Sequence, residues 1–366
     1  MLKPLSILHT ESSLGWGGQE IRILSESAGL IRRGHQVKLI CAPESRILNE
    51  APAWKVPVFA LPIAKKRLVG LKCMFEWLKV DKCHVVSTHS STDSWLTAVA
   101  LLALGKPCSM VRTRHISAPV PRNFMTRWLY TKATARIVTT GEKLKRELVE
   151  RNRYPEARIE SVPTGVDSTR FAPGDRAAAR QKVGLPAGAT LVGIVATLRS
   201  WKGHRYLVEA FAGLPENAML VIVGDGPQRE ALEKLIARLG LTGRVRLAGN
   251  QRDVVPWLQA LDIFALPSYA NEGVPQALVQ AMLVGLPCVT THAGSIAELA
   301  IDGQTALVVK PQDAKSLGGA LKRLLDEEGL RKTLGEAARR HCAEGFSYEK
   351  MLDKMEAVYR RVSGRY

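Results

Sequence analysis

The sequence contains no apolar run that approaches the roughly 20 residues needed for a membrane-spanning helix. Its cysteines also lack the paired spacing that is typical of a zinc site. We therefore expect reduced thiols and, because the sequence begins directly with an expected strand, a cytosolic protein. The cysteines are Cys41, Cys73, Cys83, Cys108, Cys288 and Cys342.

Acidic residues are scarce relative to basic ones, since 34 against 52 give a net charge of +18. Residues 1–170 contain 27 basic and 14 acidic residues, a net of +13, which leaves +5 for the remainder. A basic half suits an anionic partner such as membrane phospholipid, a phosphorylated glycolipid or nucleic acid. No recognition-helix, zinc or RNA-binding signature accompanies the charge, so nucleic acid ranks last and no nucleic-acid partner is expected. A merely soluble basic surface is the alternative.

Alternating strand and helix patterns predict a parallel α/β sheet in the first half of the chain. The expected elements are a strand at 5–10, a helix at 19–33 and a strand at 37–41. The glycine-rich loop at 11–18 is a weak dinucleotide fingerprint, because a third glycine and an acid after the second strand are missing. The 366 residues suffice for two domains, and the α/β rhythm repeats from residue 190.

The stretch 261–291 combines a buried strand, a polar turn and a helix. Residues 263–266 predict the strand, 276–284 a helix that Gly285 ends, and 287–291 the next strand. Glu272 therefore lies where a strand leads into a helix, beside N–H groups that attract anions. In an open α/β sheet, this is where a ligand is expected.

This stretch resembles the donor-sugar motif of retaining glycosyltransferases of the GT-B fold, family 4, which reads E-G-x-P-x-x-x-x-E-A-M. The resemblance implies that Glu272 contacts hydroxyls of the transferred sugar. It also implies that position 280 holds the ribose of the nucleotide, which the amide of Gln280 can still bind although the family has an acid there. The matching positions are Glu272, Gly273, Pro275, Ala281 and Met282. The donor-binding residues that follow would be Gly273, Val274, Pro275 and Gln276, and backbone N–H groups after Glu272 would bind the donor phosphate.

A second match follows the expected strand at 190–196. Lys202 and Gly203 correspond to the family's K-G pair, and the resemblance implies that Lys202 neutralises the donor diphosphate. Thr197 occupies the usual arginine position, so Arg199 would supply the missing charge. In the stretch at 219–227, Gly224 would approach the nucleotide.

The matches to the motifs of this family are looser in the first half of the chain. The resemblance implies that Gly17 and Gly18 let the backbone approach the donor phosphate and the acceptor. Two expected strands, at 84–89 and 110–115, each end in a histidine. By resemblance, His115 would place a dipole or charge beside the reacting sugar, with His89 behind it. A lone strand-end histidine is more often structural, so this assignment depends on the family pattern.

The resemblance implies an α/β protein of the GT-B fold, with two Rossmann-like parallel-sheet domains facing across a deep cleft. We expect an N-terminal acceptor-side domain at 1–172 and a nucleotide-sugar domain at 173–345. A helix at 346–366 would then cross back to the first domain. Pro173 and Gly174 begin the expected linker.

The implied reaction moves a hexose or related sugar from a nucleoside diphosphate, UDP or GDP, to a hydroxyl of a glycolipid or polysaccharide, with retention. No carboxylate is placed as a covalent nucleophile. The resemblance implies that the leaving diphosphate helps to deprotonate the acceptor. Lys202 and Arg199 would stabilise its charge. The sequence lacks a D-x-D run, and we expect these cations to replace a metal, so no cofactor is expected. Lipopolysaccharide or another envelope glycan is the expected product.

Two basic segments with aromatic residues, at 64–80 and 121–136, suit either a membrane interface or packed helices with solvated lysines. We expect peripheral contact with the inner face of the cytoplasmic membrane. Two other functions stay open. Thr197 and Gln280 favour a sugar-nucleotide-binding protein without transfer activity, and the same cleft suits a GT-B epimerase that acts on the sugar nucleotide itself.

Overall fold

The computed structural model describes residues 3–116, 118–270 and 272–364. The chain forms two compact units: unit 1 comprises Met1–Thr164 and Glu349–Tyr366, and unit 2 comprises Gly165–Tyr348. The chain therefore changes unit at 164/165 and again at 348/349, where the sequence led us to expect changes at 172/173 and 345/346. Each unit is described by itself below.

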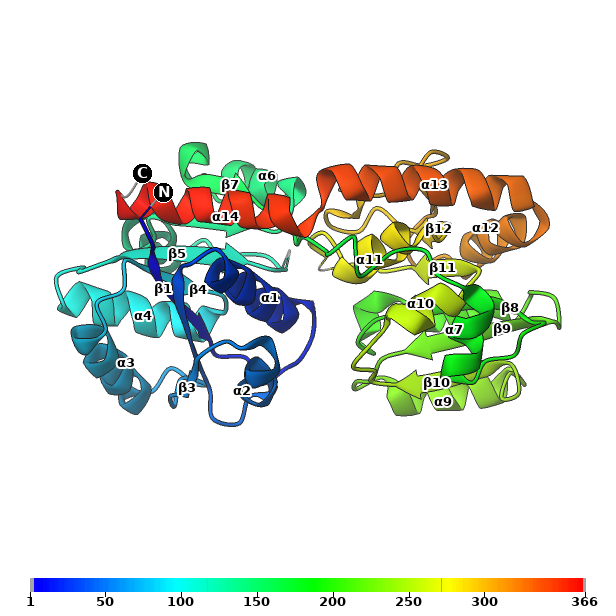
Figure 1. Ribbon diagram of the computed structural model, residues 1–366, viewed down its shortest axis with the longest axis horizontal. Helices are drawn as coiled ribbons and strands as arrows, with labels where there is room; N and C mark the ends of the chain where they lie inside the picture. Colours follow the sequence, from blue (N-terminus) through cyan, green and yellow to red (C-terminus); the bar gives the residue numbers. More distant parts are fainter. Residues whose placement is uncertain (1–2, 117, 271, 365–366) are drawn as a thin grey trace. The chain divides into compact units, whose positions relative to one another are not determined.

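Unit 1 is built on a parallel sheet with the strand order β3-β2-β1-β4-β5-β6-β7 (Figure 1). Its central strands are almost entirely buried because both faces of the sheet are covered by helices. Neighbouring strands pair in parallel, with His9 of β1 opposite both Leu39 of β2 and Ser87 of β4. The strands are β1 Ser6–Glu11, β2 Gln36–Cys41, β3 Val58–Ala60, β4 Val85–Thr88, β5 Ser109–Arg114, β6 Arg136–Thr139 and β7 Ile159–Ser161.

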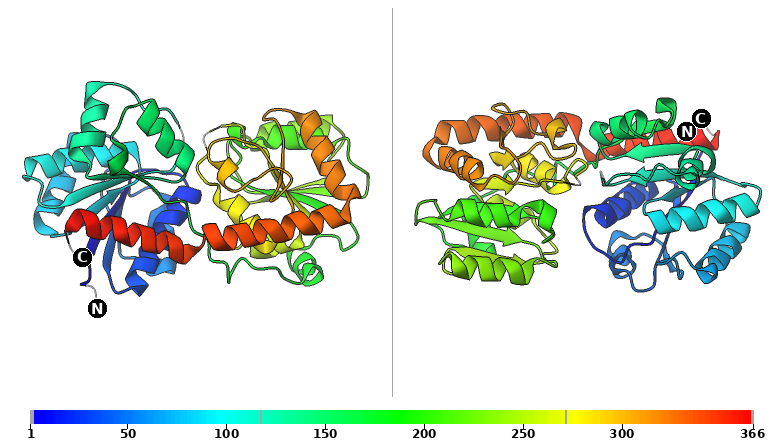
Figure 2. Two further views of the ribbon diagram at one scale, coloured as in Figure 1. Left: turned by 90° about the horizontal axis from the view of Figure 1, so that it is seen from above. Right: turned by 180° about the vertical axis from the view of Figure 1, so that it is seen from behind.

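Helices cover both faces of this sheet (Figure 2). One apolar cluster joins α1 to β2, and another joins α3 and α4 to the central strands. The α-helices are α1 Gly18–Arg32, α2 Arg46–Glu50, α3 Leu68–Val80, α4 Ser91–Ala103, α5 Phe124–Trp128, α6 Glu142–Glu150 and α14 Tyr348–Ser363. The short helical turns are η1 Ala51–Trp54, η2 Leu129–Ala133 and η3 Glu156–Arg158.

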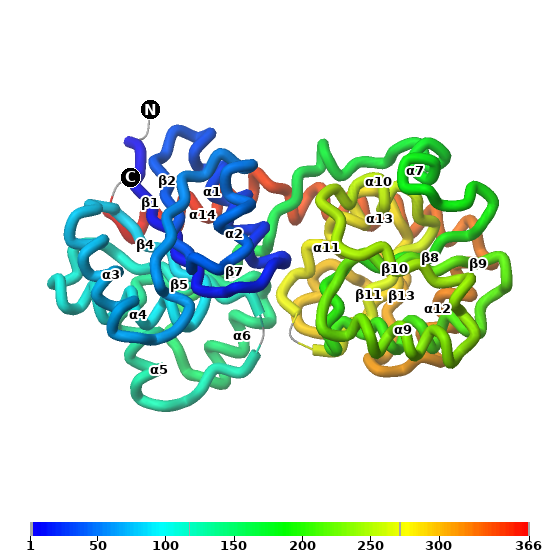
Figure 3. Tube along the Cα trace, turned by 90° about the horizontal axis from the view of Figure 1, so that it is seen from below, coloured from blue at the N-terminus to red at the C-terminus, as the bar shows by residue number. Residues whose placement is uncertain are grey.

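Helix α14 brings the end of the chain back to unit 1, beside its beginning (Figure 3). The Tyr359 hydroxyl is completely buried and bonds to Glu26 at 2.6 Å and to Ser87 at 3.0 Å. Arg33 forms ion pairs with Glu349 and two further acids of the same helix. The contact therefore combines apolar packing with polar bonds to α1 and β4.

Unit 2 contains a second parallel sheet with the order β10-β9-β8-β11-β12-β13. Its strands are β8 Thr190–Val195, β9 Ala218–Val223, β10 Val245–Gly249, β11 Ile263–Leu266, β12 Cys288–Thr290 and β13 Leu307–Val308. Its helices are α7 Arg176–Val183, α8 His204–Phe211, α9 Arg229–Arg238, α10 Val255–Ala260, α11 Gln276–Val284, α12 Ala314–Asp326 and α13 Glu328–Gly345, with turns η4 Ser200–Lys202 and η5 Ile296–Glu298.

Both units are therefore Rossmann-like, which confirms the expected fold class. The strand order reverses between β1 and β4 in unit 1 and between β8 and β11 in unit 2. Ligands of such sheets bind beyond the carboxyl ends of the strands at these reversal points. In the part of the chain that the structure describes, none of the helices is long and apolar enough to cross a membrane.

Candidate active site

Two of the predicted residues meet beyond the carboxyl ends of β8 and β11. Lys202 ends the turn η4 after β8, and Glu272 follows β11. The Nζ atom of Lys202 lies 2.6 Å from Oε1 of Glu272, and the hydroxyl of Ser268 donates to the same oxygen at 2.7 Å. Glu272 is only 4% exposed, where an unpaired carboxylate would be costly. The predicted cation and carboxylate thus form an ion pair at the reversal point of the second sheet.

The backbone of Glu272 is held by the loop that follows β12. Gly294 has φ +59°, and a Cβ atom there would lie 1.8 Å from the carbonyl oxygen of Glu272. The N–H of Ser295 donates to that same carbonyl at 3.3 Å. Only glycine tolerates both the backbone conformation and the close approach.

Two further glycines bring the loop after β8 close to its neighbours. Gly203 has φ +77°, and a Cβ atom there would lie 2.1 Å from the carbonyl oxygen of Pro267. Gly224 has φ +141°, and its Cβ would lie 2.0 Å from the carbonyl oxygen of Ala196. The guanidinium carbon of Arg199 lies 5.8 Å from the centre of the Trp201 ring, so this cation stacks on the same loop.

Helix α11 begins directly after the motif that contains Glu272. The first N–H groups of any helix have no partner inside the helix. Pro275, which precedes α11 with an extended backbone, provides no side-chain cap for those of α11. The Oε1 atom of Gln276 is buried and has no hydrogen-bond partner within the described residues. Gln280 lies one turn further along and is 8% exposed. Residues 273–275 are buried too.

In unit 1, three histidines form a hydrogen-bonded row. His9 lies in β1, His89 follows β4 and His115 follows β5. Nδ1 of His9 is 2.9 Å from Nε2 of His89, and Nδ1 of His89 is 2.9 Å from Nε2 of His115. Burial lowers the pKa of all three rings, that of His89 and His115 well below the usual value, so all three are neutral at pH 7.

A buried carboxylate pair lies beside this row. Asp93 accepts bonds from the backbone N–H groups of His89 and Ser90 and from the hydroxyl of Thr10, so it caps α4 as a charged group. Glu11 at the end of β1 is also completely buried. Burial, together with the charge of Asp93, raises the pKa of Glu11 to about 8. Glu11 therefore holds a proton at neutral pH.

The predicted glycine pair lies at the start of α1. Gly17 has an extended backbone, with φ −178° and ψ −157°, and Gly18 is the first residue of the helix. The side chain of Gln19 donates to Glu11 and, at 3.0 Å, to Ser90. The start of α1 is thus fastened to the carboxylate pair.

Two family models match most of the chain. The model described as Glycosyltransferase Family 4 matches residues 16–170, and the model described as Glycosyl transferases group 1 matches residues 175–341. A D-inositol 3-phosphate glycosyltransferase from Rhodococcus jostii is 30% identical over 390 residues, which cover 96% of this chain and 86% of that protein. The chain belongs to the group 1 glycosyltransferase family.

Other relatives of the glycosyltransferase agree with this assignment. An Escherichia coli protein named UDP-Gal:alpha-D-GlcNAc-diphosphoundecaprenol alpha-1,3-galactosyltransferase is 27% identical over 97% of this chain and 96% of its own length. A Nocardia farcinica D-inositol 3-phosphate glycosyltransferase is 32% identical, and the match covers 77% of this chain and 63% of that protein. Anabaena HepE in complex with UDP-glucose has the same fold, with a TM-score of 0.87 and 18% identity over 98% of this chain and 100% of HepE. Transfer activity is thus preferred to the epimerase and the non-catalytic binder.

Sequence reasoning missed the deeper members of the unit 1 cluster in this glycosyltransferase. His9 and Glu11 sit in an expected buried strand, where polar residues at the carboxyl end are a signal of function. Ser90 and Asp93 show the S-x-x-D spacing of a capping box, which the structure contains at the start of α4. Neither signal reveals that the two pairs meet.

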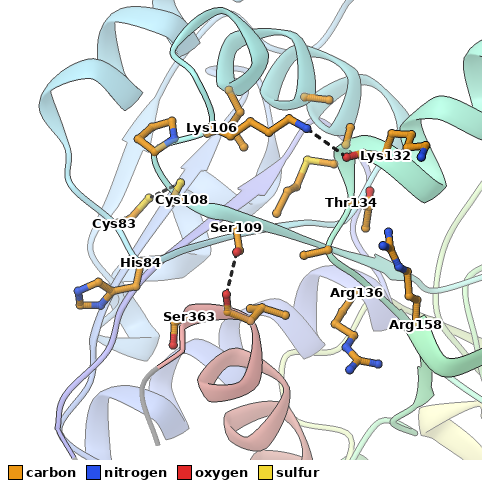
Figure 4. Close-up of a pocket in the computed structure, with 17 residues that line it drawn as sticks. Cys83, His84, Lys106, Cys108, Ser109, Lys132, Thr134, Arg136, Arg158 and Ser363 are labelled. Atoms are coloured by element: carbon orange, nitrogen blue, oxygen red, sulfur yellow. Dashed lines mark hydrogen bonds between the residues drawn. The ribbon is translucent and has the colours of Figure 1, made fainter.

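A cavity of 650 Å³ lies at the opposite edge of the unit 1 sheet, at the amino ends of β4, β5 and β6 (Figure 4). None of the predicted site residues lines it. Two of its cations already bond to backbone carbonyls: Nζ of Lys106 to Lys132 at 3.4 Å, and Nη1 of Arg158 to Thr131 at 2.6 Å. Because these carbonyls belong to the end of η2, the cations cap a helical turn.

Proposed function

We propose that this glycosyltransferase moves a sugar, with retention of configuration, from a nucleoside diphosphate to a hydroxyl of a glycolipid or polysaccharide. The Lys202–Glu272 ion pair is the observation that carries this proposal. In a nucleoside diphosphate sugar, the anionic diphosphate is attached directly to the sugar carbon that reacts. The ammonium group of Lys202 suits the diphosphate, and the carboxylate of Glu272, 2.6 Å away, suits the hydroxyl groups of the attached sugar.

The residues of unit 2 have complementary roles in this proposal. The carboxylate of Glu272 accepts bonds from sugar hydroxyls, and Ser268 and Gly294 fix its direction. Lys202 and Arg199 stabilise the diphosphate, together with the first N–H groups of α11. Gln280 binds the ribose.

The chemistry follows from the charges at this site. The carboxylate of Glu272 already binds Lys202 and Ser268. It is therefore better suited to positioning the sugar than to acting as a nucleophile on it. The bond between the sugar carbon and the diphosphate oxygen breaks, and the acceptor oxygen bonds to the same face of that carbon. The leaving diphosphate takes the acceptor's proton, which gives retention without a protein nucleophile, and no metal is required.

Glu272→Gln tests the proposal. The substitution keeps the size of the side chain but removes the charge that pairs with Lys202. We expect kcat/KM for transfer to fall by about 100-fold, in the range seen when a positioned polar group is lost. Glu216→Gln, at an exposed position of the same unit, is the control and should transfer at the wild-type rate. Wild-type activity in the Glu272 variant would overturn the site.

The relatives guide the choice of donor and acceptor. HepE was crystallised with UDP-glucose, and the Escherichia coli relative is named for transfer from UDP-galactose to a sugar on diphosphoundecaprenol. We therefore propose UDP as the first nucleotide to test, GDP as the second, and a lipid-linked diphosphate sugar as the acceptor class. The setting would be envelope glycan assembly, such as that of lipopolysaccharide.

We also propose that unit 1 contacts the inner face of the cytoplasmic membrane through one defined surface, which we call the basic–apolar surface. It consists of residues 65–69 at the start of α3 and residues 122–127 around α5. Leu68, Val69, Phe124 and Met125 are 83%, 63%, 80% and 56% exposed. The cations among these residues are Lys65, Lys66, Arg67, Arg122 and Arg127.

Side-chain stacking connects the two parts of the basic–apolar surface. Nζ of Lys66 lies 5.4 Å from the centre of the Trp95 ring, and Trp95 stacks on Trp128 with 6.0 Å between ring centres. Exposed apolar side chains among cations suit the interface of an anionic bilayer, where the rings and chains enter the lipid and the charges meet the headgroups.

Vesicle binding tests this surface. The glycosyltransferase should bind phosphatidylglycerol vesicles at low salt, and bind them weakly at high salt or when they contain only phosphatidylcholine. Replacing both Phe124 and Met125 with serine should weaken binding at least about tenfold, because two exposed apolar side chains no longer enter the lipid. Ile301→Ser, 40% exposed on unit 2, is the control. Equal binding by the double variant would exclude this surface.

A further inference from the structure

The three histidines of unit 1 differ in their access to solvent. His9 is 0% exposed, His89 is 4% exposed, and His115 is half-buried. The row therefore runs from the interior of the sheet toward the carboxyl edge, and His115 is its outer end. The Nδ1 atom of each inner ring is hydrogen-bonded to Nε2 of the next ring. Nε2 of His115 is therefore occupied by His89, and its Nδ1 remains for a ligand.

The two hydrogen bonds couple the tautomers of the three rings. A neutral imidazole carries one N–H, so each bond in the row needs the proton of one ring and the lone pair of the next. In one arrangement, every ring carries its proton on Nδ1, and His115 presents an N–H donor to a ligand. In the other, every ring carries it on Nε2, and His115 presents a bare nitrogen. Mixed arrangements lose at least one of the bonds.

The inner end decides between these two arrangements. Nε2 of His9 has no hydrogen-bond partner among the described residues. The neighbouring buried groups are the Arg22–Glu26 pair, whose Nε and Oε2 atoms are 3.5 Å apart, and the Tyr359 ring, which meets His9 at an angle of 83°. Because Nε of Arg22 and Oε2 of Glu26 face each other in this ion pair, Nη2 of Arg22 is the donor left without a partner among the described residues.

A bare Nε2 on His9 corrects this imbalance. It adds an acceptor to a region that holds an unpaired donor, whereas a proton on the same atom would add a second donor. Buried N–H groups without acceptors are rarer and less favourable than buried acceptors without donors. The arrangement with every proton on Nδ1 is therefore favoured by the interior of the protein.

We propose that His9 and His89 are positioning residues that hold His115 as its Nδ1–H tautomer, so that His115 donates a hydrogen bond to an oxygen of the bound donor substrate. The inference rests on the proposed function for the identity of that substrate. It assigns a role to His9, which is too deeply buried to contact a ligand itself. It also makes His115 a neutral donor that cannot accept a bond from a sugar hydroxyl.

Nitrogen NMR of the whole protein reads the tautomers directly. With ¹⁵N-histidine, long-range proton–nitrogen spectra distinguish Nδ1–H from Nε2–H, and single substitutions assign the signals among the eight histidines. At pH 7.5 we expect the Nδ1–H form for His9, His89 and His115 alike. The Nε2–H form, or a mixture, at His115 in the wild-type protein would overturn the proposal.

Substitutions at His9 connect the tautomer to substrate binding. His9→Asn keeps an N–H near the position of Nδ1 and should preserve both the His115 spectrum and the kinetics. His9→Leu removes that donor, so His115 should show mixed tautomers, and KM for the nucleotide sugar should rise about tenfold, the loss of one good hydrogen bond, while kcat changes little. An unchanged His115 spectrum in the leucine variant would refute the coupling.

The two proposals fail separately. If Glu272→Gln transfers sugar normally while His115 is in the Nδ1–H form, the donor site is wrong and the coupling of the tautomers stands. If transfer depends on Glu272 while His115 is in the Nε2–H form, the coupling is wrong and the donor site stands. The spectrum of the wild-type protein needs no variant, so a substitution at His9 that prevents folding leaves the test intact.

Discussion

Glu11 and Asp93 share one buried region but differ in charge. Burial raises the pKa of Asp93 to about 6, but two backbone N–H bonds and a threonine hydroxyl stabilise its ionised form, so Asp93 is charged at pH 7. Glu11 has no cation among its hydrogen-bond partners, which are Ser13, Gln19 and Ser90. Two like charges in one buried place are unfavourable, so Glu11 takes the proton.

This division predicts how the stability of unit 1 depends on pH. The pKa of Glu11 is about 8 in the folded protein and 4.5 as its ordinary value. Because the folded pKa is raised, this group's contribution is complete below its unfolded pKa and is lost as the pH rises through 8. We expect the contribution of Glu11 to the free energy of unfolding to fall between about pH 6.5 and 8, by up to about 1.4 kcal/mol per pH unit.

Urea unfolding of Glu11→Gln measures this contribution. The variant carries no ionisable group at position 11, so its stability lacks this fall, and the stability of the wild type relative to the variant should decrease over the same pH range. The histidines, whose lowered pKa values reduce stability as the pH falls through about 6.5, are present in both proteins and cancel in this difference. Glu230→Gln, on an exposed helix of unit 2, should behave like the wild type. Parallel curves for the position-11 variant and the wild type would contradict the protonated state.

The residues of the donor motif could be recognised in the sequence, but their partners could not. Glu272 and Lys202 lie in short motifs with glycine and proline at fixed spacing, which made them recognisable 70 residues apart. Nothing in the spacing of His9 and His89, or of Glu11 and Asp93, indicates contact. They meet because β1 pairs with β4. This pairing arises because the chain, after β3, crosses back over the sheet to the other side of β1.

At the scale of secondary structure, the proposed donor site depends on a contact between two loops. The loop after β12 supports the loop after β11, with Gly294 against the carbonyl of Glu272. Periodicity predicted these elements well: the bounds expected for β11 and α11, 263–266 and 276–284, are those observed. The contact between the two loops could not be predicted, because the periodicity of apolar residues indicates helices and strands but does not indicate how the loops between them pack.

Gly294→Ala tests this support. The new Cβ would overlap the backbone of Glu272, so we expect the loop to shift and kcat/KM to fall about tenfold or more, since small misplacements of positioning groups reduce activity strongly. Gly303→Ala is the matched control, with φ +69° and no atom within 4 Å of the added Cβ. It carries the same left-handed strain without the collision. Activity assays on the two variants separate the contact from the strain, and equal losses would show that the contact is unimportant.

At the scale of the whole molecule, unit 1 is assembled from two separate parts of the chain. Helix α14 covers α1 and the centre of the sheet, with the hydroxyl of Tyr359 between Glu26 and Ser87. The sequence predicted a helix at 346–366 that crosses back to the first domain, and the helix spans Tyr348–Ser363. Its polar bonds to α1 were not predictable, since they join residues more than 300 positions apart.

Tyr359→Phe tests how much this contact contributes. The variant leaves a buried carboxylate oxygen of Glu26 without its hydroxyl donor, which costs about 1–3 kcal/mol. We expect the unfolding of unit 1 to shift to lower urea concentration and that of unit 2 to stay in place. Tyr206→Phe, whose hydroxyl accepts a bond from Gln312 at an exposed site, is the control for hydroxyl removal. No shift in the Tyr359 variant would mean that apolar packing alone holds α14.

The split of unit 1 also sets an order of events during synthesis of the protein. Residues 3–164 leave the ribosome before residues 165–348, which form the whole of unit 2. At about 5–20 residues per second, the intervening stretch takes on the order of 10–40 s to make. For that time, the face of α1 that α14 later covers is open to water and to other chains. Unit 2 can therefore finish folding first, and the earlier half of the protein depends on chaperones or on its own partial stability until α14 emerges.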